Sequence, residues 1–182
     1  MKIRFVLLVL LLLVGCSSPQ NPKGTTVKVQ RVVSGQTLEV VEVGTSPPLI
    51  QRVRLLGIEA PDLKQQPWGE QSRKYLETLL NEKGQQATGS VVLESEEQEK
   101  DSYGRRLAYV WRNGNLLNEQ ILKAGYALSV SNNADRASTP PSNKYGTRLN
   151  YAQEWARIME NGIWNPQKPL RSTPAEFRRQ NP

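Results

Sequence analysis

The chain carries stretches in which apolar and polar residues alternate with the period of a β-strand. The alternation and the β-branched composition predict five strands, at residues 27–33, 37–43, 49–58, 90–94 and 106–111. The turn signal Ser34-Gly35-Gln36 separates the first two stretches, so these are expected to pair as a hairpin. A second turn rich in glycine and proline precedes the third stretch, which is therefore expected to continue the same sheet.

Three later segments carry apolar residues at helical spacing and are each followed by a glycine that can end a helix. The predicted helices are residues 68–83, 116–124 and 148–160. Three strands, a helix, two strands and two helices indicate an α+β fold, and five short strands suit a small closed barrel. We therefore expect a five-stranded OB-fold barrel with three helices over residues 26–165, followed by a flexible tail at residues 166–182.

The N-terminus has the order of a signal peptide. Lys2 and Arg4 precede ten apolar residues, Phe5 to Val14, which are too few for the roughly 20 that a membrane-spanning helix needs. The stretch ends in Leu13-Val14-Gly15-Cys16, which resembles the bacterial lipobox, so residues 1–15 are expected to be removed and Cys16 to carry the lipid. An ordinary secretory signal with an incidental cysteine is the alternative.

This interpretation places the protein outside the cytoplasm. Residues 16–25 are rich in serine, proline and asparagine and predict a tether between lipid and domain. We expect an exported, membrane-anchored lipoprotein at the cell envelope, and a monomer.

Composition limits the chemistry that the domain can perform. Cys16 is the one cysteine and the chain has no histidine, which excludes disulfides, thiolate sites and imidazole bases. Without Lys2 and Arg4, the chain has 22 basic and 17 acidic residues. This balance favours a polyanionic partner such as nucleic acid, although solvated surface charge gives the same sum.

Charged residues gather at the end of the third predicted strand. Arg54, Glu59 and Asp62 lie there, and Arg105 follows the Tyr103-Gly104 turn. Arginines match phosphate oxygens, and a carboxylate can activate water or hold a hard cation, so these residues suit phosphodiester cleavage. Structural ion pairs at strand ends are the alternative. The acidic residues 94–101 are expected to form a solvated hairpin tip.

Residues 26–164 resemble the staphylococcal nuclease (thermonuclease) family. The motifs that carry the resemblance are Val33-Ser34-Gly35-Gln36-Thr37, Val53-Arg54-Leu55-Leu56-Gly57-Ile58-Glu59-Ala60-Pro61-Asp62, Asp101-Ser102-Tyr103-Gly104-Arg105-Arg106-Leu107-Ala108-Tyr109, Leu117-Asn118-Glu119 and Gly125-Tyr126-Ala127. Each motif alone is weak, but their order is specific. The resemblance implies an OB barrel with three helices, calcium dependence, and hydrolysis of DNA and RNA.

The resemblance also implies roles for single residues. Arg54 and Arg105 match the family arginines that grip the phosphate, and Tyr103 is expected to bind substrate beside them. Asp62 falls where the family has a glutamate, its proposed general base, so the carboxylate is kept on a shorter side chain. Because a misplacement of about 1 Å can cost about 100-fold in rate, this exchange alone can slow the reaction.

The implied calcium site departs further from the family. Glu59 and Gln36 stand where aspartate ligands are usual, and Ala60 replaces a threonine that offers its backbone carbonyl. Calcium is thus expected on Gln36, Glu59, Ala60 and Asp62. The site has lost one formal negative charge, and affinity in oxygen sites follows ligand charge, so binding is expected to be weak.

Three functions remain open at this point. The first is an exported nuclease that cleaves DNA or RNA with calcium-assisted attack of water. The second is a catalytically impaired OB-fold module that binds nucleic acid or protein at the cell envelope, as the changes at Gln36, Ala60 and Asp62 suggest. The third is a structural envelope lipoprotein without a role in nucleic-acid chemistry.

Overall fold

The computed structural model describes residues 22–42, 44, 47–81, 89–130 and 144–181. The predicted signal peptide, Cys16, most of the tether and the end of the first predicted helix beyond Asn81 lie outside these residues. Within the described part, no helix combines the length and the apolar character needed to cross a membrane.

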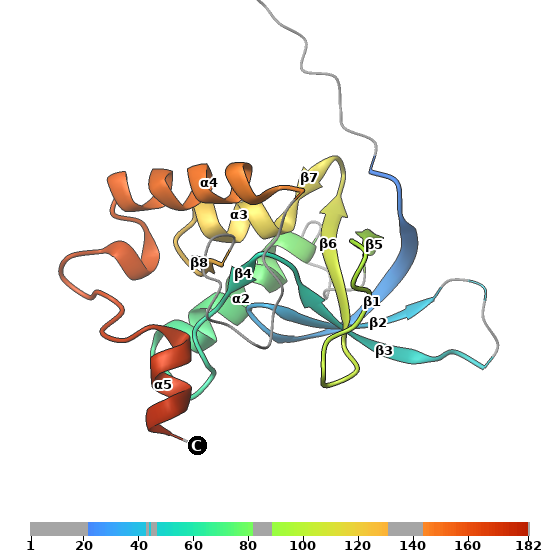
Figure 1. Ribbon diagram of the computed structural model, residues 1–182, viewed down its shortest axis with the longest axis horizontal. Helices are drawn as coiled ribbons and strands as arrows, with labels where there is room; N and C mark the ends of the chain where they lie inside the picture. The colour runs from blue at the N-terminus through green and yellow to red at the C-terminus, as the bar shows by residue number, and fades with distance from the viewer. Residues whose placement is uncertain (1–21, 43, 45–46, 82–88, 131–143, 182) are drawn as a thin grey trace, which may run out of the picture.

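Five strands form a closed barrel (Figure 1). They are β1 (Thr25–Ser34), β2 (Thr37–Glu42), β3 (Ile50–Leu55), β5 (Ser90–Glu94) and β6 (Arg106–Arg112). The antiparallel order β3-β2-β1-β5-β6 is closed by parallel pairing of β3 with β6, in which Arg54 lies opposite Leu107. The α+β class and the five-stranded OB-fold barrel are therefore confirmed.

The barrel interior is built from the alternating apolar residues of its strands. In β1, Val27 and Val29 are fully buried, and a register irregularity after Val29 lets Val32 also face inward. Alternation with a bulge is how a strand bends around a small barrel without exposing its apolar side.

Helices gather on one side of the barrel (Figure 1). They are α2 (Trp68–Leu80), α3 (Leu117–Lys123), α4 (Gly146–Ile158) and α5 (Pro174–Gln180), with a 3₁₀ turn at Gly162–Trp164. The expectation of three helices is wrong by one. The extra helix, α5, lies in residues that we expected to be a flexible tail, and Thr173 and Glu176 form a reciprocal capping box at its start.

The third predicted strand, residues 49–58, is interrupted. Gly57 has a φ of +71°, which turns the chain out of the barrel sheet after Leu55. The following strand β4 (Ile58–Glu59) pairs instead with β8 (Leu128–Ser129), while β7 (Asn115–Leu116) extends the edge of β6. This break separates Arg54 from Glu59 and creates the corner on which the site is built.

The two ends of the acidic stretch at residues 94–101 differ from expectation, whereas Glu97 and Glu99 in its middle are exposed as expected. Glu94 and Asp101 are buried rather than solvated, being 5% and 8% exposed. The Glu94 carboxylate accepts a hydrogen bond from Trp111 Nε1 at 2.9 Å. Glu94 and Asp101 both accept hydrogen bonds from other side chains of the protein, and these bonds replace the hydration that burial removes.

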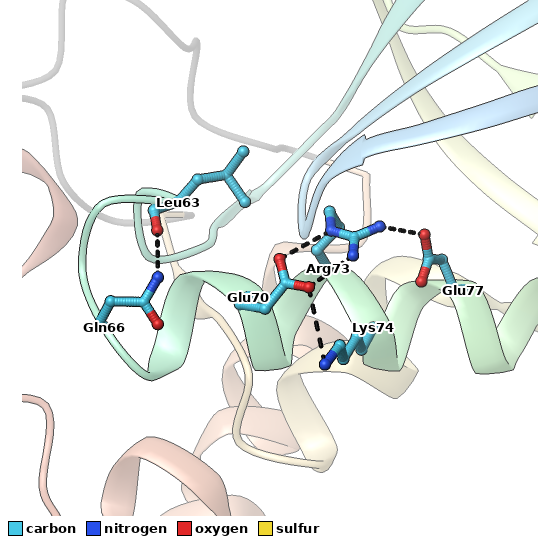
Figure 2. Close-up of polar contacts among 6 residues, drawn as sticks. All are labelled: Leu63, Gln66, Glu70, Arg73, Lys74 and Glu77. Atoms are coloured by element: carbon cyan, nitrogen blue, oxygen red, sulfur yellow. Dashed lines mark hydrogen bonds and ion pairs between the residues drawn. The ribbon is translucent and has the colours of Figure 1, made fainter.

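The loop between β4 and α2 is held by polar contacts at the start of the helix (Figure 2). Gln66 Nε2 donates to the Leu63 carbonyl at 3.0 Å, which closes the loop. One turn later, Arg73 donates through Nε to Glu70 at 3.0 Å and also contacts Glu77. The hydrogen bond from Arg73 lowers the pKa of the Glu70 carboxyl, so Glu70 stays ionised at the positive end of the helix.

Candidate functional site

One groove, of about 1110 Å³, collects almost all of the predicted site residues. Its lining includes Gln36, Arg54, Glu59, Asp62, Tyr103 and Arg105. They come from the β1–β2 turn, the β3–β4 corner, the loop after β4 and the β5–β6 loop. Ala60 is the exception, because it is 1% exposed and does not belong to the lining.

Arg54 is fixed by the corner that Gly57 creates. Its Nη1 donates to the Leu55 carbonyl at 2.8 Å and its Nη2 donates to the Ile58 carbonyl at 2.7 Å. These carbonyls lie on either side of the strand break at Gly57. Arg54 thus stabilises the corner. The residue is 3% exposed and belongs to the lining of the groove.

Arg105 is positioned by Asp101, which was expected to lie in a solvated hairpin tip. The Asp101 side chain is 1% exposed, and its Oδ2 accepts from Arg105 Nε at 2.7 Å. Its Oδ1 accepts from the backbone N–H groups of Tyr103 and Arg105, at 3.0 and 2.9 Å. One buried carboxylate therefore shapes the turn and aims the arginine that the turn carries.

Tyr103 lies at the outer edge of this turn. Its side chain is 76% exposed, and the Arg105 guanidinium lies 5.3 Å from its ring centroid. A ring in this position can pack against Arg105 on one side and offers a face to a ligand on the other. Its role in substrate binding stays a prediction.

Asp62 is half-buried at the rim of the groove. Its Oδ1 accepts from the Lys64 N–H at 2.9 Å, and its carbonyl accepts from the Gln65 N–H at 2.8 Å. Gly69 of α2 packs directly on the Asp62 carbonyl, where a Cβ would lie only 1.9 Å from the oxygen. The backbone around Asp62 is thereby held against the helix, and Asp62 belongs to the lining of the groove.

Gln36 ties the β1–β2 turn to the β3–β4 corner. Its Oε1 accepts from the Ala60 N–H at 2.6 Å, and its carbonyl accepts from the Leu55 N–H at 2.9 Å. The neighbouring Gly35 approaches α2 so closely that a Cβ would lie 1.8 Å from Ser72 Oγ. Gln36 in this arrangement is a structural bridge, with its amide oxygen directed to the backbone.

Glu59 has a partner that the sequence analysis did not anticipate. Its side chain is 4% exposed, and its Oε1 contacts Nη2 of Arg178, which α5 brings into the groove lining. The signal available in the sequence was Thr173-Pro174-Ala175-Glu176, which has the spacing of a capping box with proline in the first turn. That signal could have located the helix, although not its partner.

The predicted calcium ligands do not fit a calcium site as they are arranged here. The oxygen of Gln36 is held by a backbone N–H, Glu59 contacts a guanidinium, and an oxygen of Asp62 accepts from Lys64. Among the described residues, no three aspartate, glutamate, histidine or cysteine side chains come together as a possible metal site. Calcium prefers six to eight oxygen ligands and several negative charges, which this set does not supply.

Comparison with known proteins bears on the chemistry of this groove. Residues 52–166 match the family model described as "Staphylococcal nuclease homologue". The chain is 32% identical over 151 residues to the thermonuclease of Staphylococcus hyicus, and the match covers 80% of this chain and 79% of that protein. It is 30% identical over 152 residues to the thermonuclease of Staphylococcus intermedius, and this match covers 81% of this chain and 80% of that protein. Endonuclease YncB of Bacillus subtilis (strain 168) is 28% identical over 154 residues, covering 81% and 65%.

Proposed function

Because this chain belongs to the staphylococcal nuclease family, we propose that it is a nuclease that hydrolyses phosphodiester bonds of DNA or RNA. The observation that carries the proposal is the meeting of Arg54, Asp62 and Arg105 in one groove. Two guanidinium groups and a carboxylate from three separate segments match the needs of attack by water on a phosphodiester.

In the proposed reaction, the phosphodiester lies between Arg105 and the β3–β4 corner. Asp62 accepts a proton from a water molecule whose oxygen forms the new bond to phosphorus. The bond from phosphorus to the departing nucleotide oxygen breaks, and that oxygen takes a proton from solvent. Arg54 and Arg105 stabilise the negative charge that builds on the phosphoryl oxygens, and both are held before the substrate arrives. No step passes through calcium, since the ligand set does not fit it.

A second candidate is a nucleic-acid-binding module with little or no hydrolysis. The observation that favours it is the engagement of Gln36 and Glu59 within the protein, while Arg105 and Tyr103 remain at the groove surface. Phosphate binding needs the cationic and aromatic side chains, whereas hydrolysis also needs an activated water.

The test is cleavage of labelled single-stranded DNA and RNA by the purified protein, in calcium and in chelator. We expect products from the unaltered protein and a loss of about 100-fold or more in kcat/KM for Arg105→Gln and Asp62→Asn, as for removal of one transition-state group. Arg179→Gln is the matched control, because Arg179 is exposed on α5 and is not among the residues lining the groove. Salt-dependent binding of DNA or RNA without cleavage products would contradict the nuclease and favour the nucleic-acid-binding module.

We also propose that the protein acts at the cell envelope, tethered by a lipid on Cys16. The support is the order of Lys2 and Arg4, the apolar residues 5–14 and Gly15-Cys16 in the sequence. The Cys16→Ala variant is expected to keep its signal peptide and to run more slowly on a gel than the processed protein. Normal processing of this variant, without acyl label on the unaltered protein, would contradict the lipid anchor.

A further inference from the structure

The C-terminal helix α5 is anchored beside the groove by the segment that precedes it. Gln65, 6% exposed and three residues after Asp62, donates through Nε2 to the Ser172 carbonyl at 2.7 Å. The capping box of Thr173 and Glu176 then starts the helix at a defined residue. Figure 1 shows α5 next to the segment that joins β4 to α2. The direction of the helix is thus set before it reaches Arg178.

Arg178 contacts the carboxylate of Glu59, whose negative charge would be unfavourable in a buried position without a partner. Glu59 is almost fully removed from water, and a buried carboxylate needs a cation or strong donors to remain ionised. The Arg178 guanidinium supplies both a positive charge and N–H donors at Oε1. Its side chain is 42% exposed, so it reaches Glu59 while part of it stays open to the groove that Arg105 also lines.

The charges of the site are consistent with a monovalent cation. The resemblance implies three carboxylates around one divalent ion, which leaves a single net negative charge. Here Gln36 is neutral, so two carboxylates remain, Glu59 and Asp62, and the guanidinium of Arg178 contacts Glu59. Arg178 therefore already supplies one positive charge at the more deeply buried of these two carboxylates.

We propose that Arg178 is the resident cation of this groove, taking the place of a divalent metal beside Glu59 and contacting the phosphate of bound nucleic acid. This inference rests on the proposed function, because it assumes that the groove binds nucleic acid. It makes α5 a functional part of the domain, since the helix delivers a third arginine to the substrate. Phosphate binding then needs no divalent ion.

The first test measures binding of a fluorescein-labelled single-stranded DNA oligonucleotide to the full protein in chelator, by anisotropy over a salt series. We expect salt-dependent binding that added calcium changes less than about twofold, since the cation is built in. Arg178→Gln should weaken binding about tenfold and reduce the salt slope by about 0.7, the value for one contact to a single strand. Arg178→Lys should recover most of the loss, and Arg179→Gln on the same helix should bind like the unaltered protein.

The second test is independent of nucleic acid. Calcium should leave the Tm of the unaltered protein unchanged, because Arg178 already neutralises Glu59. It should raise the Tm of Arg178→Gln, in which the carboxylate lacks that guanidinium.

The outcomes separate the two proposals. Binding by Arg178→Gln equal to that of the unaltered protein, or a calcium-induced rise in the Tm of the unaltered protein, would overturn the role of Arg178. Absence of any salt-dependent DNA binding by the unaltered protein would overturn the proposed function and the phosphate contact. The calcium experiment would then still decide whether Arg178 is the resident cation.

Discussion

At the scale of single residues, Asp101 holds the turn that presents Arg105. Its buried carboxylate makes two contacts to backbone N–H groups through Oδ1 and one to Arg105 through Oδ2. Two functions are thus divided between the two oxygens of one side chain. A substitution that changes only one oxygen can separate the shape of the turn from the aim of the arginine.

Asp101→Asn is that substitution, because the amide keeps an oxygen for the backbone and places an NH₂ group opposite Arg105 Nε. We expect about a tenfold loss of DNA affinity and a decrease of about 1–3 kcal/mol in the free energy of unfolding, from the lost charge-assisted hydrogen bond. Anisotropy titration and urea unfolding measure the two effects. In an Arg105→Gln background, Asp101→Asn should cost no further affinity.

Ser102→Ala serves as the control, since this exposed neighbour lies in the same turn. If Asp101→Asn lowered stability but left DNA affinity intact, Asp101 would support the fold without aiming Arg105.

At the scale of elements, sequence patterns located the barrel strands because alternation of apolar residues directly reports one buried face. Patterns did not locate the break at Gly57, since the apolar residues Leu55, Leu56 and Ile58 continue across it and are all buried. They also missed α5, because its seven residues include one large apolar side chain, Phe177, and show no apolar periodicity. The local pattern of apolar residues indicates which positions are buried. It does not indicate that the chain leaves the barrel sheet after β3 and pairs with β8 in a second sheet.

The candidate site follows the same logic. Arg54, Glu59 and Asp62 are close in sequence, so their proximity in space was predictable from one motif. Arg178 is 119 residues from Glu59, and no spacing rule joins an arginine in a polar tail to a carboxylate on a strand. The placement of Arg54, Glu59 and Asp62 could thus be predicted from one motif, and that of Gln36, Tyr103 and Arg105 from the resemblance to the family. The partner of Glu59 required the three-dimensional structure.

The contact between the β1–β2 turn and α2 gives a prediction at this scale. Gly35→Ala should decrease the free energy of unfolding by about 1–3 kcal/mol, the range for overpacking, because the new Cβ would meet Ser72 Oγ at 1.8 Å. Chemical denaturation of Gly35→Ala, Ser72→Gly and the double variant measures the coupling between the two sites. The double variant should be more stable than the sum of the single effects predicts, and strict additivity would show that the turn adjusts independently of α2.

At the scale of the whole molecule, Glu94 joins the barrel to the segment that leads into α4. Its carboxylate accepts from Trp111 Nε1 on β6 at 2.9 Å and from the Tyr145 hydroxyl at 3.0 Å, and it also contacts Lys144. The Tyr145 ring packs edge-on against Trp111, with the centroids 5.6 Å apart. A single buried carboxylate therefore connects two parts of the domain that are far apart in sequence.

Glu94→Gln should decrease the free energy of unfolding near neutral pH by about 1–3 kcal/mol, since donors at a buried acceptor lose a charged partner. The hydrogen bond that Lys144 donates to Glu94 raises the pKa of Lys144 above its usual 10.5. Burial is the main cause that raises the pKa of Tyr145 above its usual 10.0, and the hydrogen bond that its hydroxyl donates to Glu94 is the second cause. A raised pKa means that the folded protein binds more protons than the unfolded chain at alkaline pH. The associated stability is complete below about pH 10 and is lost as the pH rises through the folded-state values.

The stability difference between the unaltered protein and Glu94→Gln should therefore stay constant from about pH 8 to about pH 10 and shrink from about pH 10 to about pH 11, as the protons held by this cluster are released. Urea unfolding of both proteins across this range measures it, with Glu97→Gln, in the same acidic stretch but exposed, as the control. A difference that stays constant with pH would show that Glu94 acts through its hydrogen bonds to Trp111 and Tyr145 without holding the charge of Lys144. The connection between barrel and helix would then depend on neutral contacts alone.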